Sequence, residues 1–197
     1  MIDKTEFLGY QEHEYNPIIR QQTKNLLIDL IKKYKPHNIL EIGTFIGYSS
    51  AVMMESDKDC FVTTVEKDKT NFEYAVKNLE NLGFKGRFDA VNEDAYEFLI
   101  DAENTQKKYD FIFLDGPKGQ YIKYLPYLKR ILNVGGILMA DDVLFYGLVN
   151  SKESIKHKHR SMVNNLRKFL DTIQNDVDFK TTIYDFEDGV CVSEKIN

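Results

Sequence analysis

Short apolar runs alternate with amphipathic segments of helical period along most of this chain, and this alternation limits the possible folds more than any other feature. It is typical of an α/β fold whose helices cover a mainly parallel sheet. The expected strands are 38–42, 61–66, 87–91, 109–114, 137–140, 180–184 and 190–193. The last two are joined through Asp188-Gly189, which predicts an antiparallel hairpin. We therefore predict a doubly wound, mainly parallel seven-stranded sheet with an antiparallel C-terminal hairpin.

The helical segments lie between these strands. The expected helices are 17–34, a helix that begins at 48–54, 70–82, a helix that runs through Leu99, 118–132 and 161–173. Pro17 is a favourable residue for the first turn of a helix. Pro126 lies inside 118–132, and an internal proline predicts a kink or a break there.

Composition narrows the class of protein further. A length of 197 residues fits one domain, 1–197, with an N-terminal helical segment at about 1–36. The net charge of −5 argues against a sequence-independent nucleic-acid coat protein, although it allows a local basic patch. Cys60 and Cys191 lie in apolar runs and predict neither a disulfide framework nor a zinc site. No signal peptide or membrane span is evident, so we expect a soluble cytoplasmic protein.

Acidic residues lie at the ends of the first five expected strands. They are Glu41, Glu66, Asp94, Asp115 and Asp141. In open α/β sheets, ligands bind at the carboxyl ends of the strands. The acidic residues therefore indicate a ligand site, with a solvated acidic rim as the alternative.

The first strand runs into a turn with glycines at Gly43 and Gly47. The three-glycine dinucleotide fingerprint is absent, and no Gly-Lys-Ser/Thr follows as in a P-loop. Glu66 lies where an acidic residue can bind ribose hydroxyls. Glu41 would repel phosphate and favour a positively charged group. A cationic nucleoside without a pyrophosphate, such as S-adenosylmethionine, fits this pattern.

Residues 41–50 resemble the first motif of class I S-adenosylmethionine-dependent methyltransferases. The variant Glu-Ile-Gly-Thr-Phe-Ile-Gly-Tyr-Ser is similar to the cation-dependent O-methyltransferase family, which includes catechol and caffeoyl-CoA O-methyltransferases. Residues 113–121, 135–144 and 188–190 resemble further motifs of that family. The resemblance extends from about residue 17 to 195 and implies a Rossmann-like methyltransferase fold.

The resemblance and the strand ends together predict the cofactor-binding residues. These are Glu41, Gly43, Thr44, Gly47, Ser49, Glu66, Asp94, Ala95 and Asp115. Asp94 and Ala95 are expected near the adenine of S-adenosylmethionine.

The resemblance also implies a divalent cation, expected to be Mg²⁺, held by Asp115, Asp141 and Asp142. Carboxylate oxygens suit such an ion. Adjacent side chains point to opposite faces of a regular strand, but the chain can turn at a strand end and bring both to one ion. The family usually has Asn where this chain has Asp142. A solvated loop pair is the alternative for Asp141 and Asp142.

Lys118 matches the lysine that serves as general base in the family, and with Asp115 it is the predicted catalytic residue. A lysine beside a cation-bound hydroxyl is suited to accept a proton, because the nearby positive charge lowers both pKa values. An ordinary surface lysine is the alternative.

Residues 152–168 carry six basic side chains against Glu153 alone, so this segment is strongly positive. It follows Asp142 in the chain and is expected near the mouth of the active site. Phosphates of RNA or of a coenzyme A tail would suit it. The predicted contacts are Lys156, Lys158, Arg160 and Arg167. The alternative is that these basic side chains lie in solvent at the start of a helix and bind no ligand.

Within the family, 115–121 and 141–147 are most similar to bacterial tRNA 5-hydroxyuridine methyltransferases. The resemblance thus implies tRNA as substrate and 5-methoxyuridine in the anticodon loop as product, where the base is already unstacked. It also implies a homodimer. A small catechol, phenolic or acyl-CoA acceptor is the first alternative. A non-catalytic partner subunit and an NAD-dependent oxidoreductase are the others, and the missing third glycine weakens the last.

Overall fold

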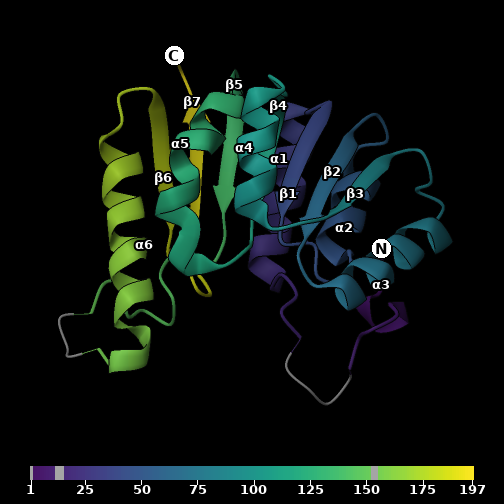
Figure 1. Cartoon of the computed structure of the whole chain (residues 1–197), viewed down its shortest axis with the longest axis horizontal. Helices are drawn as coiled ribbons and strands as arrows, with labels where there is room; N and C mark the ends of the chain where they lie inside the picture. The colour runs from purple at the N-terminus through teal and green to yellow at the C-terminus, as the bar shows by residue number, and fades with distance from the viewer. Residues whose placement is uncertain (1, 12–15, 152–154) are drawn as a thin grey trace. The chain divides into compact units, whose positions relative to one another are not determined.

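The computed structural model describes residues 2–11, 16–151 and 155–197 (Figure 1). The chain divides into two compact units, Met1–Phe98 and Leu99–Asn197. The assignment of 1–197 to a single domain stays a prediction. Within the described residues, no helix is long and apolar enough to cross a membrane.

The first unit contains three strands with helices between them. Its elements are η1 (Lys4–Glu6), α1 (Gln21–Tyr34), β1 (Asn38–Ile42), α2 (Tyr48–Ser56), β2 (Phe61–Glu66), α3 (Lys69–Asn81) and β3 (Phe88–Asn92). Helix α4 (Ala95–Asn104) follows and spans the boundary between the units. Strand β2 pairs in parallel with both β1 and β3, so the order is β3-β2-β1.

The second unit contains four strands in the order β4-β5-β7-β6. Its elements are β4 (Tyr109–Leu114), η2 (Lys118–Gln120), α5 (Tyr121–Ile131), β5 (Leu132–Ala140), α6 (His157–Asn175), β6 (Phe179–Tyr184) and β7 (Val190–Lys195). The β4–β5 pair is parallel, whereas β7 is antiparallel to both β5 and β6. These seven strands confirm the predicted α/β class, with a mainly parallel sheet and an antiparallel C-terminal hairpin.

The central strands have the burial expected of a sheet covered on both faces. Four consecutive residues of β4, from Phe111 to Leu114, have no exposed surface. In β1, Ile39, Leu40 and Ile42 are equally buried. Because these strands are apolar on both faces, only their carboxyl ends are available for polar chemistry.

The bounds of several predicted helices differ from the structure: α4 extends beyond Leu99 to Asn104, and α6 begins at His157 rather than at residue 161. Helix α1 begins at Gln21 rather than at residue 17, since Asn16 binds the backbone of Gln11 in both directions, at 3.1 and 2.7 Å, and Arg20 is extended. Helix α5 continues through Pro126, and the interruption falls earlier, between η2 and α5. The proline removes one backbone donor, but the helix is buried along one face by Tyr121, Leu125 and Leu128 and therefore persists.

Strand β5 begins at Leu132, earlier than the predicted 137. The register against β4 shifts between Tyr109 and Phe111, so the glycine pair at 135–136 lies within an irregular part of the strand. A Cβ atom on Gly136 would lie 2.9 Å from the carbonyl oxygen of Asp110, which explains the requirement for glycine.

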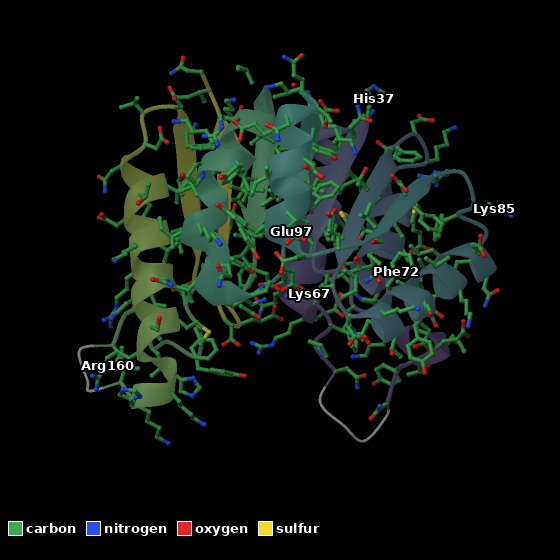
Figure 2. All side chains as sticks on the ribbon, in the orientation of Figure 1. His37, Lys67, Phe72, Lys85, Glu97 and Arg160 are labelled. Atoms are coloured by element: carbon green, nitrogen blue, oxygen red, sulfur yellow. The ribbon has the colours of Figure 1, made fainter. Side chains whose placement is uncertain are left out.

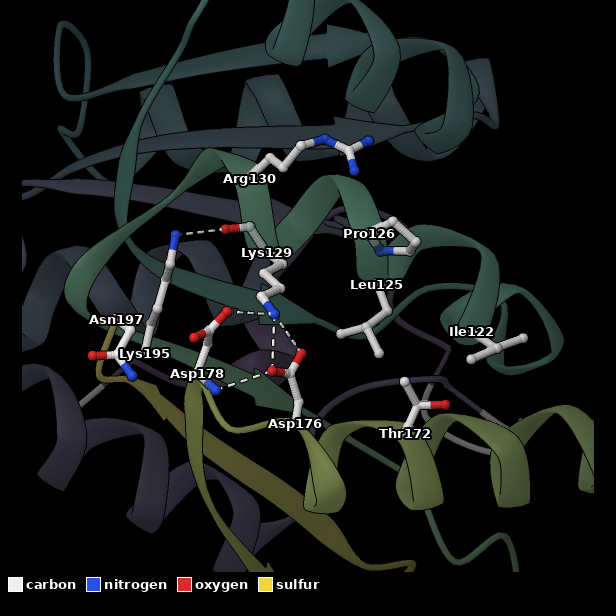
Figure 3. Close-up of a pocket in the computed structure, with 10 residues that line it drawn as sticks. All are labelled: Ile122, Leu125, Pro126, Lys129, Arg130, Thr172, Asp176, Asp178, Lys195 and Asn197. Carbon is white, nitrogen blue, oxygen red and sulfur yellow. Dashed lines mark hydrogen bonds and ion pairs between the residues drawn. The ribbon is translucent and has the colours of Figure 1, made fainter.

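A cavity of about 500 Å³ lies in the second unit between α5, α6 and the end of β7 (Figure 3). Lys129 lies in its wall and binds Asp176 at 2.6 Å and Asp178 at 2.7 Å. Lys195 donates to the carbonyl oxygens of Lys129 and Leu132 at the end of α5. These charged groups bind one another and the backbone, so they have a structural role.

We expect Lys129→Met to lower the free energy of unfolding by about 1 kcal/mol at pH 7, the upper range for a partly exposed ion pair. Burial acts to raise the pKa of Asp176, but hydrogen bonds from Lys129 and from the Asp178 N–H lower it below its usual value. The stabilisation is therefore complete above the pKa of the unfolded chain, about 3.9, and is lost as the pH falls through the lower folded value. Urea unfolding at pH 7 and pH 3 tests this, with the exposed Lys168→Met as control. An equal loss at both pH values would contradict an ionic origin.

Candidate functional site

The turn that follows β1 has an unusual backbone. Gly43, Phe45 and Gly47 have φ angles of 99°, 49° and 86°. A positive φ is accessible to glycine but disfavoured for phenylalanine. Two hydrogen bonds to β2 hold the turn: Gly43 N–H donates to the Val65 carbonyl at 3.0 Å, and Phe45 N–H donates to Glu66 Oε2 at 2.8 Å. Gly47 is the N-cap of α2, so the turn delivers the chain directly into that helix.

Glu41 lies beneath this turn and is completely buried. Its carboxylate accepts hydrogen bonds from the hydroxyls of Ser49, Ser50 and Thr64. These bonds join β1, the first turn of α2 and β2, so Glu41 has a positioning role. Ser49 is among the predicted residues, whereas Ser50 and Thr64 are not. Their place within otherwise apolar segments was the available sign, because a buried hydroxyl needs a partner.

Thr44 continues the same buried network. Its hydroxyl lies 2.5 Å from the Thr64 hydroxyl. The turn is thus supported from below by side-chain hydroxyls and a carboxylate, and its backbone groups are set in fixed directions. The assignment of Glu41, Gly43, Thr44, Gly47 and Ser49 to cofactor binding stays a prediction.

Glu66 and Asp94 lie at neighbouring strand ends, since Glu66 is in register with Asn92 of β3. Glu66 accepts from the N–H groups of Phe45 and Asp68, and burial raises its pKa although these bonds oppose the shift. Asp94 accepts from the Tyr96 N–H at the start of α4, where Ala95 is the first residue. It also binds Lys67 at 2.9 Å, at an edge where Figure 2 shows Lys67 beside Glu97. Both carboxylates are therefore held in place by their surroundings.

The second unit brings three carboxylates together. One oxygen from each of Asp115, Asp141 and Asp142 lies within 4.8 Å of the others. Asp141 follows the end of β5, and Asp142 has a φ of 55°, so the chain turns there and directs both side chains to one place. The structure confirms this turn. Asp141 is only 5% exposed, so it is not a solvated loop residue, whereas the side chain of Asp142 is 27% exposed.

The electrostatics of this cluster favour a cation. Burial, together with the charges of Asp115 and Asp142, raises the pKa of Asp141 to about 8. Burial also raises the pKa of Asp115. Lys118 is paired with the cluster, at 2.5 Å from Asp115 and 3.2 Å from Asp142. Three carboxylates and one ammonium leave excess negative charge in a site with little water, and these oxygen ligands fit Mg²⁺ or Ca²⁺.

Lys118 belongs to η2, and its side chain is only 16% exposed, so it is not an ordinary surface lysine. Burial acts to lower its pKa, but the carboxylates of Asp115 and Asp142 raise it well above the usual value. With the carboxylates alone, Lys118 is thus an ammonium group. It can accept a proton only when another positive charge neutralises the cluster.

Tyr121 joins the two strand ends that carry the acidic residues. Its buried hydroxyl lies 3.0 Å from the Leu114 carbonyl oxygen and 3.2 Å from that of Asp141. Burial raises its pKa well above the usual value, so it remains a neutral phenol. Tyr121 lies within the motif at residues 113–121, but the sequence alone predicts no role for it.

The loop that follows Asp142 is held at both ends. Asp188 accepts from Leu144 N–H with its carbonyl at 2.8 Å and from Tyr146 N–H with its carboxylate at 3.2 Å. Arg167 donates to the carbonyls of Leu148, Val149 and Ser151. The prediction that Arg167 contacts a ligand phosphate therefore requires correction: its guanidinium holds this loop, because buried carbonyls need donors.

The start of α6 lies beside the turn that carries Lys118. Asn165 donates to the Gly119 carbonyl at 2.8 Å, and Met162 also lies next to Gly119. Lys156, Lys158 and Arg160 are exposed at this end of α6, as Figure 2 shows for Arg160. The basic surface thus lies in the same region as η2, as expected. Lys152 and Glu153 fall outside the described residues.

Comparison with known proteins agrees with this geometry. A family model described as O-methyltransferase matches residues 9–196, nearly the whole chain. This chain therefore belongs to the O-methyltransferase family.

Individual relatives agree with that assignment. A caffeoyl-CoA O-methyltransferase from Populus kitakamiensis is 24% identical over 85% of this chain and 73% of its own length. The chain spans only about half the length of four other curated relatives that it matches, 51% to 56%.

Solved structures have the same fold. A Staphylococcus aureus protein described as of the caffeoyl-CoA O-methyltransferase type is 30% identical, with a TM-score of 0.83 over 91% of this chain and 85% of that one. An O-methyltransferase from Bacillus cereus, solved in complex with SAH, is 23% identical, with a TM-score of 0.81 over 94% of this chain and 84% of that one. The methyltransferase fold thus extends along 91% to 94% of the chain.

Proposed function

We propose that this protein is a cation-dependent O-methyltransferase that transfers a methyl group from S-adenosylmethionine to a hydroxyl of a small catechol, phenolic or acyl-CoA-linked acceptor. The observation that carries the proposal is the cluster of Asp115, Asp141 and Asp142 in contact with the buried Lys118, in a member of the O-methyltransferase family. The names of the relatives, caffeoyl-CoA O-methyltransferases among them, support this class of acceptor.

In this proposal, Asp115, Asp141 and Asp142 hold a divalent cation, with Mg²⁺ as the candidate. The bound ion would supply positive charge that lowers the pKa of an acceptor hydroxyl. Lys118 accepts the proton from that hydroxyl at Nζ. Tyr121 keeps the ends of β4 and β5 in a fixed relation and so maintains the spacing of the carboxylates. S-adenosylmethionine, when bound, would supply the methyl group for the acceptor oxygen and would leave as S-adenosylhomocysteine.

The cofactor is proposed to bind at the turn after β1 and at the ends of β2 and β3. Glu66 would accept hydrogen bonds from the ribose hydroxyls, and Asp94 and Ala95 would lie near the adenine. The Bacillus cereus relative, solved with SAH, supports this choice of cofactor. A homodimer stays a prediction.

One observation favours a second candidate acceptor, 5-hydroxyuridine in tRNA. The exposed Lys156, Lys158 and Arg160 lie at the end of α6 that packs on η2. A local basic surface in a protein of net charge −5 suits a ligand that carries phosphates. Both tRNA and acyl-CoA have phosphates, whereas a simple catechol has none.

The test is methyl transfer from labelled S-adenosylmethionine in the presence of Mg²⁺, with mass spectrometry of each product. The acceptors are catechol, caffeoyl-CoA and tRNA that contains 5-hydroxyuridine. Methylated catechol or caffeoyl-CoA is the expected result, and methylation of tRNA alone would establish the second candidate. No transfer to any acceptor, with S-adenosylhomocysteine binding confirmed, would favour a non-catalytic partner subunit.

The basic surface gives a further expected result. The triple change Lys156→Gln, Lys158→Gln and Arg160→Gln should raise the KM for a phosphate-bearing acceptor and leave that for catechol unchanged. Lys180→Gln, an exposed change on β6, is the matched control. An equal effect on catechol would indicate that the triple variant disturbs the site as a whole.

A further inference from the structure

Asn78 of α3 makes three hydrogen bonds, which tie a segment near the N-terminus to the turn after β1. Its Oδ1 accepts from the Leu8 N–H at 2.8 Å, and its Nδ2 donates to the Leu8 carbonyl at 3.1 Å. The same Nδ2 donates to the Ile46 carbonyl at 2.9 Å. The side chain is only 4% exposed. Asn78 thus uses both ends of its amide to join Leu8 with the Gly43–Gly47 turn.

The segment 7–9 also contacts this part of the molecule directly. A Cβ atom on Gly9 would lie 2.7 Å from the Tyr74 ring and 3.0 Å from Ile46 Cγ2, so the segment packs against α3 and the turn itself. Gly9 has a φ of 85°, which glycine adopts readily. The buried Phe7 packs edge-on against Tyr48, with ring centroids 5.5 Å apart. The segment therefore covers the outer side of the turn and the start of α2.

The turn requires support of this kind. Three of its five residues have a positive φ, and Phe45 is disfavoured there. Glu66 holds the N–H of Phe45, and Asn78 holds the carbonyl of the next residue, Ile46. The peptide groups on either side of the Phe45–Ile46 peptide are thereby fixed, one by the last residue of β2 and the other by α3. A binding site whose backbone groups are already oriented loses less free energy when a ligand binds.

We infer that Asn78, together with the segment 7–9, positions the Gly43–Gly47 turn for binding of the cofactor. This inference rests on the proposed function, because it takes the turn as part of the S-adenosylmethionine site. Asn78 is a positioning residue and does not touch the cofactor in this arrangement. The N-terminal segment then belongs functionally to the cofactor site.

The test is the affinity of the full-length protein for S-adenosylhomocysteine, measured by calorimetry at a temperature where every variant is folded. Asn78→Asp keeps the acceptor for the Leu8 N–H but places a carboxylate oxygen against two carbonyls. We expect it to raise the Kd at least about tenfold, the effect of losing a buried hydrogen bond. Gly9→Ala, which disturbs the segment but leaves Asn78 in place, should raise the Kd in the same direction.

Two controls separate positioning from general stability. Asn81→Asp makes the same chemical change at an exposed position of α3 and should leave the Kd unchanged. Lys129→Met lowers stability through the second unit and should also leave it unchanged. A loss of affinity in Asn78→Asp and Gly9→Ala but in neither control supports the inference.

Unchanged affinity in both folded variants overturns the inference while the proposed function stands. An equal loss in Lys129→Met also overturns it, because stability would then explain the effect. If Asn78→Asp does not fold, the Kd of Gly9→Ala for S-adenosylhomocysteine decides whether the inference holds. Absence of binding by the wild-type protein overturns the proposed function and this inference with it.

Discussion

Asp141→Asn is expected to lower cation-dependent methyl transfer by at least about 100-fold, since even residues that only support metal ligands change metal affinity about 10- to 100-fold. The exchange preserves shape, and the asparagine oxygen can still accept the hydrogen bond from the Asp142 N–H, which is 2.7 Å long in the wild type. Turnover at increasing Mg²⁺ concentrations measures the effect. Asp29→Asn, an exposed change on α1, is the control and should have no effect.

The same variant should be more stable than the wild type when a chelator is present at high pH. Burial and two neighbouring carboxylates raise the pKa of Asp141 to about 8, well above the value of about 3.9 in an unfolded chain. A raised carboxyl pKa means that the folded state loses stability as the pH rises from the unfolded value to the folded one. The substitution Asp141→Asn removes this loss of stability, because asparagine does not ionise.

Thermal unfolding in the presence of a chelator tests whether ionised Asp141 destabilises the protein when no cation is bound. The Tm advantage of Asp141→Asn should be clear at pH 9 and should shrink as the pH falls toward 4. Added Mg²⁺ should raise the Tm of the wild type and not that of the variant. A variant that retains activity and responds to Mg²⁺ like the wild type would contradict the assignment of Asp141 as a ligand.

Lys118→Met is expected to lower kcat by about 10²- to 10⁴-fold, the usual contribution of a general base. Cofactor affinity should stay within about twofold, because the variant changes proton transfer alone. Cation affinity should be retained or increased, since one positive charge leaves a cluster of three carboxylates. Loss of turnover with retained cation binding would thus separate the base from the ligands.

Lys118→Arg is the second half of this test. Arginine keeps the positive charge but does not release its proton at accessible pH. If Lys118 is the base, both variants should be inactive to a similar degree. If its charge alone is important, the arginine variant should recover most of the activity, and the role of base would be refuted. A defect confined to cofactor affinity would refute it as well.

Much of the fold was predictable from local pattern, because the seven strands follow from apolar period, whereas their order in the sheet is set by tertiary pairing. The predicted bounds of the strands 61–66 and 109–114 agree with the structure to the residue. Helix boundaries were less predictable. The start of α1 depends on Asn16 binding Gln11, and the persistence of α5 through Pro126 depends on tertiary burial.

The candidate site divides in the same way. The acidic residues at the strand ends were evident from position, because parallel strands bring their carboxyl ends to one edge. Lys118 was evident only from the resemblance to the family. Hydrogen-bond partners were not evident. Arg167 looked like a ligand contact, yet it donates to three loop carbonyls. Asn78 had no sign in the sequence, because its partners Leu8 and Ile46 are distant in the chain.

The sequence by itself determined the class of fold, the family and the types of group available for chemistry, because apolar period and motif spacing are local properties. Only the tertiary structure decided which groups share one environment and hence their protonation. Burial and the neighbouring carboxylates raise the pKa of Asp141, and the carboxylates of Asp115 and Asp142 keep Lys118 an ammonium group. Those quantities depend on distance and solvent access in space, which a linear pattern does not contain.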